Sequence, residues 1–571
     1  MLREFSFRAR ENSLERFRSE VFDILVIGGG ITGAAVARDA ISRGLSVALV
    51  ERSDFAFGTS SRSSKLIHGG LRYLQNMEFG LVFEALFERS LLLKTASHVV
   101  KPLPFYLPVF RGDPHGRALL ATGLWLYDLL ALFRAPGFHR GLSRRAMLTE
   151  IPFLRQEGLK GGFQYFDASM WDDVLVVETL RSAQQGGAAV ANYVEALDPF
   201  WEKDQISGFY VRDRETDASI KIQAKRTVIC AGPWTDKVGV KLSTQWKRWL
   251  KPSKGVHLVF DLKRIPVPGA VVMTHAQDGR IAFVMPRPDF GAGVVIIGTT
   301  DGPTSLDPEQ AEVSPEDIQY LLDLTNRTFP KLQLTREDIL STYVGVRPLM
   351  GGEHFVGSEN AGDKEETATV LQKVSREHHM DRGPGGTVVV AGGKYTTHRK
   401  MAEEIVNFTL KAWREDCSNN GGPAFPLHLR KPKTKVSINL QASEKAVAEC
   451  REQASGLGMD IPEDLLNRYG ADCFYILEMH KEKAKAAAAL KSEDPEGFSY
   501  LGARLRYAIR SEMVMHLEDF YFRRVPLYVS RKDHGLPWAE SLAQIWAEER
   551  GLSESEKNTE LERLKQHVQK N

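Results

Sequence analysis

Residues 22–51 constrain the fold more than any other part of the chain. The apolar run 22–27 has the length and composition of a strand, and it leads directly into a turn with G-x-G-x-x-G spacing, formed by Gly28, Gly30 and Gly33. Residues 31–43 then predict a helix, and residues 45–50 predict a second strand that ends at Glu51. Strand, glycine turn, helix, strand and acid in this order indicate a dinucleotide-binding βαβ unit.

Each part of this unit has a physical task. Gly28 allows a tight turn, Gly30 allows the backbone to approach a pyrophosphate, and Gly33 allows the helix to pack closely on the strand. The N–H groups at the start of the helix face the diphosphate, where the helix dipole favours negative charge. Glu51 follows the turn by about twenty residues, where a carboxylate can accept hydrogen bonds from a ribose diol.

The composition is that of a soluble globular protein with more than one core. A chain of 571 residues predicts two or three domains, and its 43% hydrophobic and 26% charged residues are ordinary values. A net charge of +2 does not favour nucleic acid as a partner. The four cysteines show neither C-x-x-C pairs nor metal-ligand spacing, which favours buried thiols in a reducing cytosolic setting and no metal site.

No stretch predicts a membrane span or a secretory signal. The most apolar segment, residues 118–133, is shorter than the ~18 residues that a span needs and contains Asp128, so we expect a buried or surface-docking helix there. Residues 1–20 carry arginines and glutamates without an apolar core, which predicts an N-terminal extension that forms a solvated helix.

The nucleotide-binding domain is predicted to be interrupted. Strand-like runs recur at residues 227–231, 256–260, 281–285, 293–297 and 387–391, with a candidate substrate domain between the first and the last. We therefore assign residues 21–415 to two interleaved domains, residues 416–436 to a linker, and residues 437–571 to a helical C-terminal domain.

Several motifs point to one family of flavoproteins. Residues 59–74 read TSSRSSKLIHGGLRYL, a loop rich in hydroxyls that suits phosphate and flavin, and residues 391–403 read AGGKYTTHRKMAE. With GGGITGA, CAGPW, SKGVHLVF, IIGTTD, GVRPL and RLRYAIRSEMVMHLEDFYFRR, they make the chain resemble the FAD-dependent glycerol-3-phosphate dehydrogenases, within the D-amino-acid-oxidase-like flavoproteins, over nearly its whole length. The resemblance implies an α/β fold in which a Rossmann-like FAD domain is interleaved with an antiparallel-sheet substrate domain.

The resemblance also implies the cofactor and the loops that hold it. FAD would lie against the glycine turn and Glu51. Further contacts are expected from Thr59, Ser60, Ser61, Ser64, Lys65, Leu66, His68, Gly232, Gly392, Gly393 and Thr396.

The implied substrate, sn-glycerol 3-phosphate, requires fixed cations for its phosphate. By resemblance these are Arg72 (with Tyr73), Arg347, Arg376 and Lys394, although a surface ion pair is the commoner fate of each alone. Lys394 is also placed to stabilise negative charge on the flavin.

Oxidation to dihydroxyacetone phosphate removes a hydride from C2 and a proton from its hydroxyl, so a proton acceptor is needed within hydrogen-bonding reach. His257 resembles the family's substrate-site histidine, and Thr299 resembles the hydroxyl beside it. We expect His257, Arg347 and Lys394 to act in catalysis. The identity of the base stays open, because His257 could also be a structural strand histidine.

The family's dehydrogenases pass electrons to a membrane quinone, whereas its oxidase branch uses oxygen. Residues 220–264 hold eleven Lys/Arg against two Asp, and Trp246 to Lys251 interleave tryptophans with cations, which suits an anionic lipid surface. A second basic run spans Arg134 to Arg145. We expect a homodimer in the cytoplasm, attached peripherally to the inner face of the cell membrane. The alternatives are an oxygen-using glycerol-3-phosphate oxidase and another flavin-dependent hydroxy-acid or amine oxidase.

Overall fold

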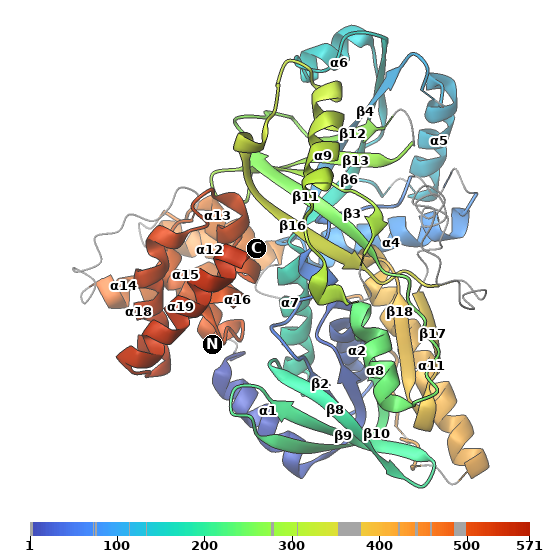
Figure 1. The fold of residues 1–571 in the computed structure, drawn as a ribbon, viewed down its shortest axis with the longest axis vertical. Helices are drawn as coiled ribbons and strands as arrows, with labels where there is room; N and C mark the ends of the chain where they lie inside the picture. Colours follow the sequence, from blue (N-terminus) through green and yellow to red (C-terminus); the bar gives the residue numbers. More distant parts are fainter. Residues whose placement is uncertain are drawn as a thin grey trace.

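A computed structural model describes residues 4–71, 74, 77–113, 115–132, 134–275, 279–304, 307–351, 378–420, 423–426, 428–439, 443–456, 460–484 and 498–570. Two β-sheets lie one above the other, and a group of C-terminal helices packs against their side (Figure 1). Three predicted site residues, Arg72, Tyr73 and Arg376, lie outside the described residues.

The lower sheet is built on the predicted βαβ unit. Strand β1 (Val21–Ile27) is central, with β2 (Val47–Val50) and β10 (Ser219–Ile229) parallel on its two sides. The sheet continues to β7 (Ala189–Ala191) at one edge and to β18 (Val388–Gly392) and β17 (His378–Arg382) at the other. Ile27 is in register with Val50 and with Ile229, so the loops that follow these three strands meet at one edge.

Both faces of this sheet are covered. Ile24 and Val26 of β1 pack into the core formed with α2 (Ile31–Ser42) and α7 (Asp172–Gln185), and α11 (His398–Asn420) lies beside α2. Leu25 and Ile27 pack on the other face, against α1 (Phe7–Ser19) and the hairpin of β8 (Val194–Glu202) and β9 (Gln205–Asp213). Burial on both faces explains why residues 22–27 are continuously apolar instead of alternating.

Helix α1 corrects the prediction for the N-terminal extension. The segment is helical as expected, but only one of its faces is solvated, because Leu14 and Phe17 are buried in the lower core. Arg10 of the same helix is buried and forms an ion pair with Asp213. A buried face of this kind cannot be recognised from the charged residues that dominate the segment.

The upper sheet is largely antiparallel, as expected for the substrate domain. Its main path runs β15-β11-β14-β13-β12-β4-β6-β3, with β16 paired to β11 and β5 paired to β6; only the β12–β4 pair is parallel. The strand bounds are β3 Leu66–Ile67, β4 Val100–Phe110, β5 Arg140–Leu142, β6 Leu159–Met170, β11 Ser253–Asp261, β12 Ala270–Thr274, β13 Ile281–Arg287, β14 Val294–Gly298, β15 Gly302–Pro303 and β16 Ile339–Arg347. Helices around this sheet are α4 Phe79–Thr95, α5 Arg117–Leu130, α6 Arg144–Glu150 and α9 Pro315–Thr328.

The later strand-like runs divide between the two sheets. The runs at 227–231 and 387–391 return to the lower sheet as β10 and β18, which confirms the interruption. The three runs between them belong instead to the upper sheet, as β11, β13 and β14. The interleaved α/β architecture is therefore confirmed.

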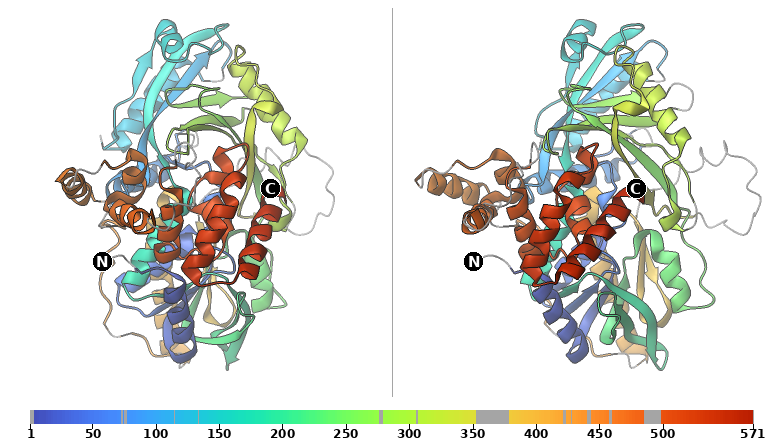
Figure 2. Two further views of the ribbon diagram at one scale, coloured as in Figure 1. Left: turned by 90° about the vertical axis from the view of Figure 1, so that its left-hand side faces the viewer. Right: turned by 60° about the vertical axis from the view of Figure 1, so that its left-hand side comes forward.

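The C-terminal region is helical, as predicted, and lies along one side of both sheets (Figure 2). Its bounds are α12 Glu444–Gly456, α13 Glu463–Tyr469, α14 Cys473–Ala484, α15 Leu501–Ser511, α16 Leu517–Arg523, α17 Leu527–Ser530, α18 Ala539–Arg550 and α19 Glu554–Lys570. Buried Asp54, just after β2, pairs with Arg523 and Arg524 and so fixes this region to the lower sheet. Helix α11 runs to Asn420, into the predicted linker; the domain boundaries themselves stay predictions.

Among the described helices, none combines the length and the apolarity that crossing a bilayer requires.

Candidate active site between the two sheets

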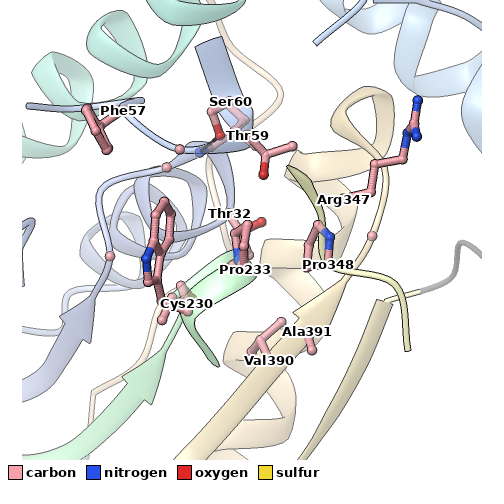
Figure 3. A pocket seen from close by; sticks show the side chains of 18 of the residues that line it. Thr32, Phe57, Thr59, Ser60, Cys230, Pro233, Arg347, Pro348, Val390 and Ala391 are labelled. Carbon is pink, nitrogen blue, oxygen red and sulfur yellow. Dashed lines mark hydrogen bonds between the residues drawn. The ribbon is translucent and has the colours of Figure 1, made fainter. Parts of the chain in front are cut away.

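A cavity of about 650 Å³ lies where the loops at the carboxyl edge of the lower sheet meet β11 and β16 of the upper sheet. Figure 3 shows its wall, with Thr59 and Ser60 on one side and Val390 and Ala391 below. This is the crevice at the ends of parallel strands where nucleotides bind in open α/β sheets.

The glycine turn has the geometry that its spacing predicts. A Cβ atom on Gly33 would lie 1.9 Å from the carbonyl oxygen of Gly28, so only glycine allows α2 to pack this closely on the turn. Gly28 itself has φ +113°, in the region that favours glycine. Gly28 and Gly30 line the cavity, whereas Gly33 supports them from behind. Ser60 Oγ accepts a hydrogen bond from the Ile31 N–H at the start of α2.

Glu51 is held in the cavity wall by the backbone. Its carboxylate accepts hydrogen bonds from Gly29 N at 2.7 Å and from Ser53 N at 2.9 Å, which fixes the side chain across the glycine turn. Burial raises the pKa of Glu51, while the two N–H donors act in the opposite direction. A diol that donates to this carboxylate would further favour its charged form.

The hydroxyl-rich loop divides into residues that line the cavity and residues that support it. Thr59, Ser60, Ser64 and His68 line the cavity. Ser61, Lys65 and Leu66 lie outside the wall. Lys65 Nζ donates to Asp172 Oδ1 at 2.6 Å and to Ser61 O at 3.1 Å, and Leu66 of β3 pairs with Ser169 of β6. The Lys65–Asp172 ion pair is buried and anchors the loop to α7.

The opposite wall comes from the turns after β10 and β18. Gly232, Gly392, Gly393, Lys394 and Thr396 all line the cavity. Thr396 Oγ1 contacts both the N–H and the carbonyl of His68, each at 3.3 Å, so the hydroxyl-rich loop and the turn after β18 are tied together.

His257 faces the cavity from β11. Its Nε2 lies 2.9 Å from Ser64 Oγ, and its ring stacks on Tyr343 with centroids 4.5 Å apart and planes at 12°. Burial, together with the charges of Arg347 and Lys65, holds the pKa of His257 well below its usual value. The imidazole is therefore neutral at pH 7. Its Nδ1 has no hydrogen-bond partner among the described residues.

Arg347, at the end of β16, also lines the cavity and is fixed by several acceptors. Its guanidinium donates to Asp301 Oδ1 at 3.2 Å and to Thr299 Oγ1 at 3.0 Å. Thr299 thus contacts Arg347 and does not line the cavity. Gly255 of β11 makes room for this group, because a Cβ atom there would lie 2.4 Å from Arg347 Nη2.

The residues of the wall that the sequence prediction missed include Arg62, Phe57 and Trp234. Arg62 and Phe57 line the cavity with the guanidinium 5.0 Å from the ring centroid, and burial lowers the pKa of Arg62 to about 10. Trp234 lies on the same wall and contacts Phe57. Arg62 lies within the TSSRSS motif and Trp234 within CAGPW, so both residues belong to motifs that the sequence had already assigned to the cofactor region.

Known proteins combine the same two regions. The family described as FAD dependent oxidoreductase matches residues 23–406, and the C-terminal domain of alpha-glycerophosphate oxidase matches residues 435–557. The aerobic glycerol-3-phosphate dehydrogenase of Staphylococcus aureus is 34% identical over 545 residues, covering 94% of this chain and 93% of that protein. The chain belongs to the FAD-dependent glycerol-3-phosphate dehydrogenase family.

Two solved structures share the fold of this chain. The glycerol-3-phosphate dehydrogenase from Bacillus halodurans, solved with FAD, is 29% identical with a TM-score of 0.76, covering 99% of this chain and 98% of that one. The L-alpha-glycerophosphate oxidase from Mycoplasma pneumoniae is 18% identical with a TM-score of 0.51, covering 68% of this chain and 95% of that one, which shows a shared fold.

The cavity wall suits the family's FAD cofactor. A Cβ atom added to Gly30 would have Ser60 Oγ as its nearest neighbour, at 3.1 Å. The backbone of Gly30 is therefore open to a diphosphate at the start of α2. The Glu51 carboxylate in the same wall can accept hydrogen bonds from a ribose. The family match and the relative solved with FAD confirm the prediction that FAD is the cofactor. The individual contact residues stay predictions.

Proposed function

We propose that this enzyme oxidises sn-glycerol 3-phosphate to dihydroxyacetone phosphate and passes the electrons to a membrane quinone. The observation that carries the proposal is that His257, Arg347 and Lys394 share one cavity with the dinucleotide-binding turn. The substrate's name comes from the relatives, and the chemistry of these side chains supports it.

The three side chains divide the work. Arg347 supplies a fixed guanidinium for the substrate phosphate, a type of contact worth about 1.5–3 kcal/mol. Neutral His257 accepts the proton of the C2 hydroxyl as the C2–O bond becomes a carbonyl. Lys394 places a positive charge on the facing wall. FAD, when bound, accepts the hydride from C2.

An acceptor assay tests the proposal. Purified enzyme supplied with sn-glycerol 3-phosphate under argon should form dihydroxyacetone phosphate with a soluble quinone, and the rate should be far lower with oxygen alone. Turnover with oxygen at the quinone rate would instead identify an oxidase. Turnover of glycine or a 2-hydroxy acid, but not of the phosphate ester, would refute the substrate.

A quinone acceptor is lipid-soluble, so we also propose that the enzyme is cytoplasmic and attaches peripherally to the inner face of the membrane. The surface expected from the sequence, Trp246 to Lys251, supports this only through its charge. Lys247 and Arg248 are exposed, but Trp246 stacks on Trp249 and donates its Nε1–H to Asp236. These indoles are already packed against the protein. The homodimer stays a prediction.

A further inference from the structure

Helix α5 is apolar on two opposite faces. Its inner face buries Leu124 and Tyr127 in the protein. Its outer face carries Leu119, Trp125, Leu129 and, just beyond the helix, Leu132, whose exposed fractions are 61%, 64%, 55% and 49%. Trp125 and Leu129 lie one helical turn apart, Leu119 is exposed one and a half turns before them, and Leu132 follows the end of the helix. We call these four exposed residues the α5 stripe. A helix that is apolar all round is normally covered on both sides.

Neighbouring α4 extends this surface. Phe79 and Phe83 of α4 are exposed at helical spacing, and Phe87 follows one turn later. Arg134 lies over the Phe87 ring at 5.8 Å, so the end of the α5 stripe adjoins the α4 phenylalanines. Lys435 lies over the same ring at 5.5 Å. The apolar surface therefore has a cationic border.

The charge around the stripe is one-sided. Residues 114–149 contain one acid, Asp128, which is buried and hydrogen-bonded to His139. The same stretch holds five arginines, Arg117, Arg134, Arg140, Arg144 and Arg145, of which Arg140 forms an ion pair with Glu150, the residue directly after the stretch. A two-fold contact between copies of the chain would bring this surface against itself, and arginine would then face arginine. Charge complementarity favours an anionic surface instead.

We propose that the α5 stripe and the exposed α4 phenylalanines form the surface that docks on an anionic lipid bilayer. Leucine and tryptophan side chains enter the headgroup boundary, while Arg117, Arg134 and Lys435 bind lipid phosphates. Helices with a wide apolar face and flanking cations lie in the bilayer interface in this way. The exposed aromatic residue Trp125 is of the type that is enriched there.

The location of this surface fits its use. The N–H of Gly69 donates to Tyr127 Oη of α5 at 3.0 Å, and a Cβ atom on Gly69 would lie 2.4 Å from Leu86 of α4. Both helices therefore pack directly on the loop whose His68 lines the cavity. Docking through α4 and α5 brings the cavity close to the lipid phase, where a quinone would be found. Only this last point rests on the proposed function.

Vesicle sedimentation of the full-length holoenzyme tests the inference. Vesicles of phosphatidylcholine with phosphatidylglycerol should bind the parent, and pure phosphatidylcholine should bind it more weakly. The double variant Trp125→Asp/Leu129→Asp should lower the partition coefficient at least about tenfold. Arg134→Glu/Lys435→Glu should remove the preference for the anionic lipid. Trp201→Asp/Tyr210→Asp, at exposed aromatic residues of β8 and β9, is the matched control and should bind as the parent does.

The outcomes separate the surfaces and the two proposals. If the α5 double variant sediments like the parent, while Lys247→Glu/Arg248→Glu does not, the docking surface is the one around Trp246 and the inference is refuted. If the α5 variant loses self-association and the parent never binds vesicles, the occupant is a second copy. Turnover with a soluble acceptor, measured in parallel, should be the same in the α5 variant as in the parent. If the parent itself shows no turnover of sn-glycerol 3-phosphate, that result counts against the proposed function alone.

Discussion

Ser64 Oγ lies 2.9 Å from Nε2 of His257, and this contact joins the loop after the dinucleotide-binding unit to strand β11 of the upper sheet. The two residues are 193 positions apart in the sequence. The hydroxyl fixes the ring on one side and Tyr343 fixes its face, so the imidazole is held in one orientation toward the cavity.

Replacement of His257 should impair the chemical step. We expect His257→Gln to lower kcat by about 10²–10⁴, the usual contribution of a general base, and to leave the bound flavin spectrum intact. Ser64→Ala should have a smaller effect, because it loosens the ring without removing it. The pKa of His257 lies well below its usual value. The pH profile of kcat should therefore have the same shape near pH 6.5 in the parent and in His257→Gln, without an additional inflection in the parent. Such an inflection would show that this histidine titrates normally.

Arg347 should act mainly on the substrate's phosphate. Arg347→Ala should lower kcat/KM by roughly ten- to a hundredfold or more, the loss of one charge-assisted contact. Asp301→Asn keeps the shape of the group that orients the guanidinium but removes its charge. It should raise KM more than it lowers kcat. Unchanged steady-state kinetics in Arg347→Ala would remove this residue from the substrate site.

The glycine turn predicts two different defects. Gly33→Ala places a Cβ atom 1.9 Å from the Gly28 carbonyl, so the apoprotein itself should unfold at a lower temperature. A Cβ atom on Gly30 would meet only Ser60 Oγ, at 3.1 Å, so we expect the Gly30→Val apoprotein to melt close to the parent while its FAD content falls. Thermal melting of apoproteins and flavin content of purified proteins are the readouts. Equal melting shifts for both variants would contradict this separation.

Buried neutral histidines should make the protein sensitive to acid. Burial lowers the pKa of His98 to about 3. As the pH falls below 6.5, the ordinary pKa of histidine, the unfolded chain takes up this proton before the folded chain does. The free energy of unfolding therefore decreases by up to about 1.4 kcal/mol per pH unit until the pH reaches the folded pKa.

His98→Gln should therefore lose less melting temperature than the parent between pH 7 and pH 5.5, whereas His428→Gln, at an exposed position, should lose as much as the parent. Equal losses in all three proteins would contradict the assignment.

Local sequence patterns predicted the fold well where one segment carries its own information. The unit from residue 22 to Glu51 is complete within thirty residues, and the glycine spacing alone requires the close approach of Gly33 to Gly28. The partition of strands between two sheets was not predictable in this way, because the pairing of β11 with β16 joins residues about ninety positions apart.

The same limit applies to the site. The sequence named Ser64, His257 and Arg347 separately, but not the contacts among them. It assigned Lys65 to the cofactor because of its motif, while the fold turns this side chain toward Asp172. The lipid contact that it assigned to Trp246 to Lys251 stays a prediction, but the hydrogen bond from Trp246 to Asp236 was not predictable from the sequence. Exposure, unlike composition, exists only after the chain has folded.

The most direct test of the central claim is anaerobic reduction of the enzyme-bound flavin, followed by its absorbance. Addition of sn-glycerol 3-phosphate should bleach the flavin in the parent and do so far more slowly in Arg347→Ala, and a membrane-type quinone should then restore the colour. A flavin that stays oxidised with glycerol 3-phosphate, but bleaches with an amino acid or a 2-hydroxy acid, would contradict the account.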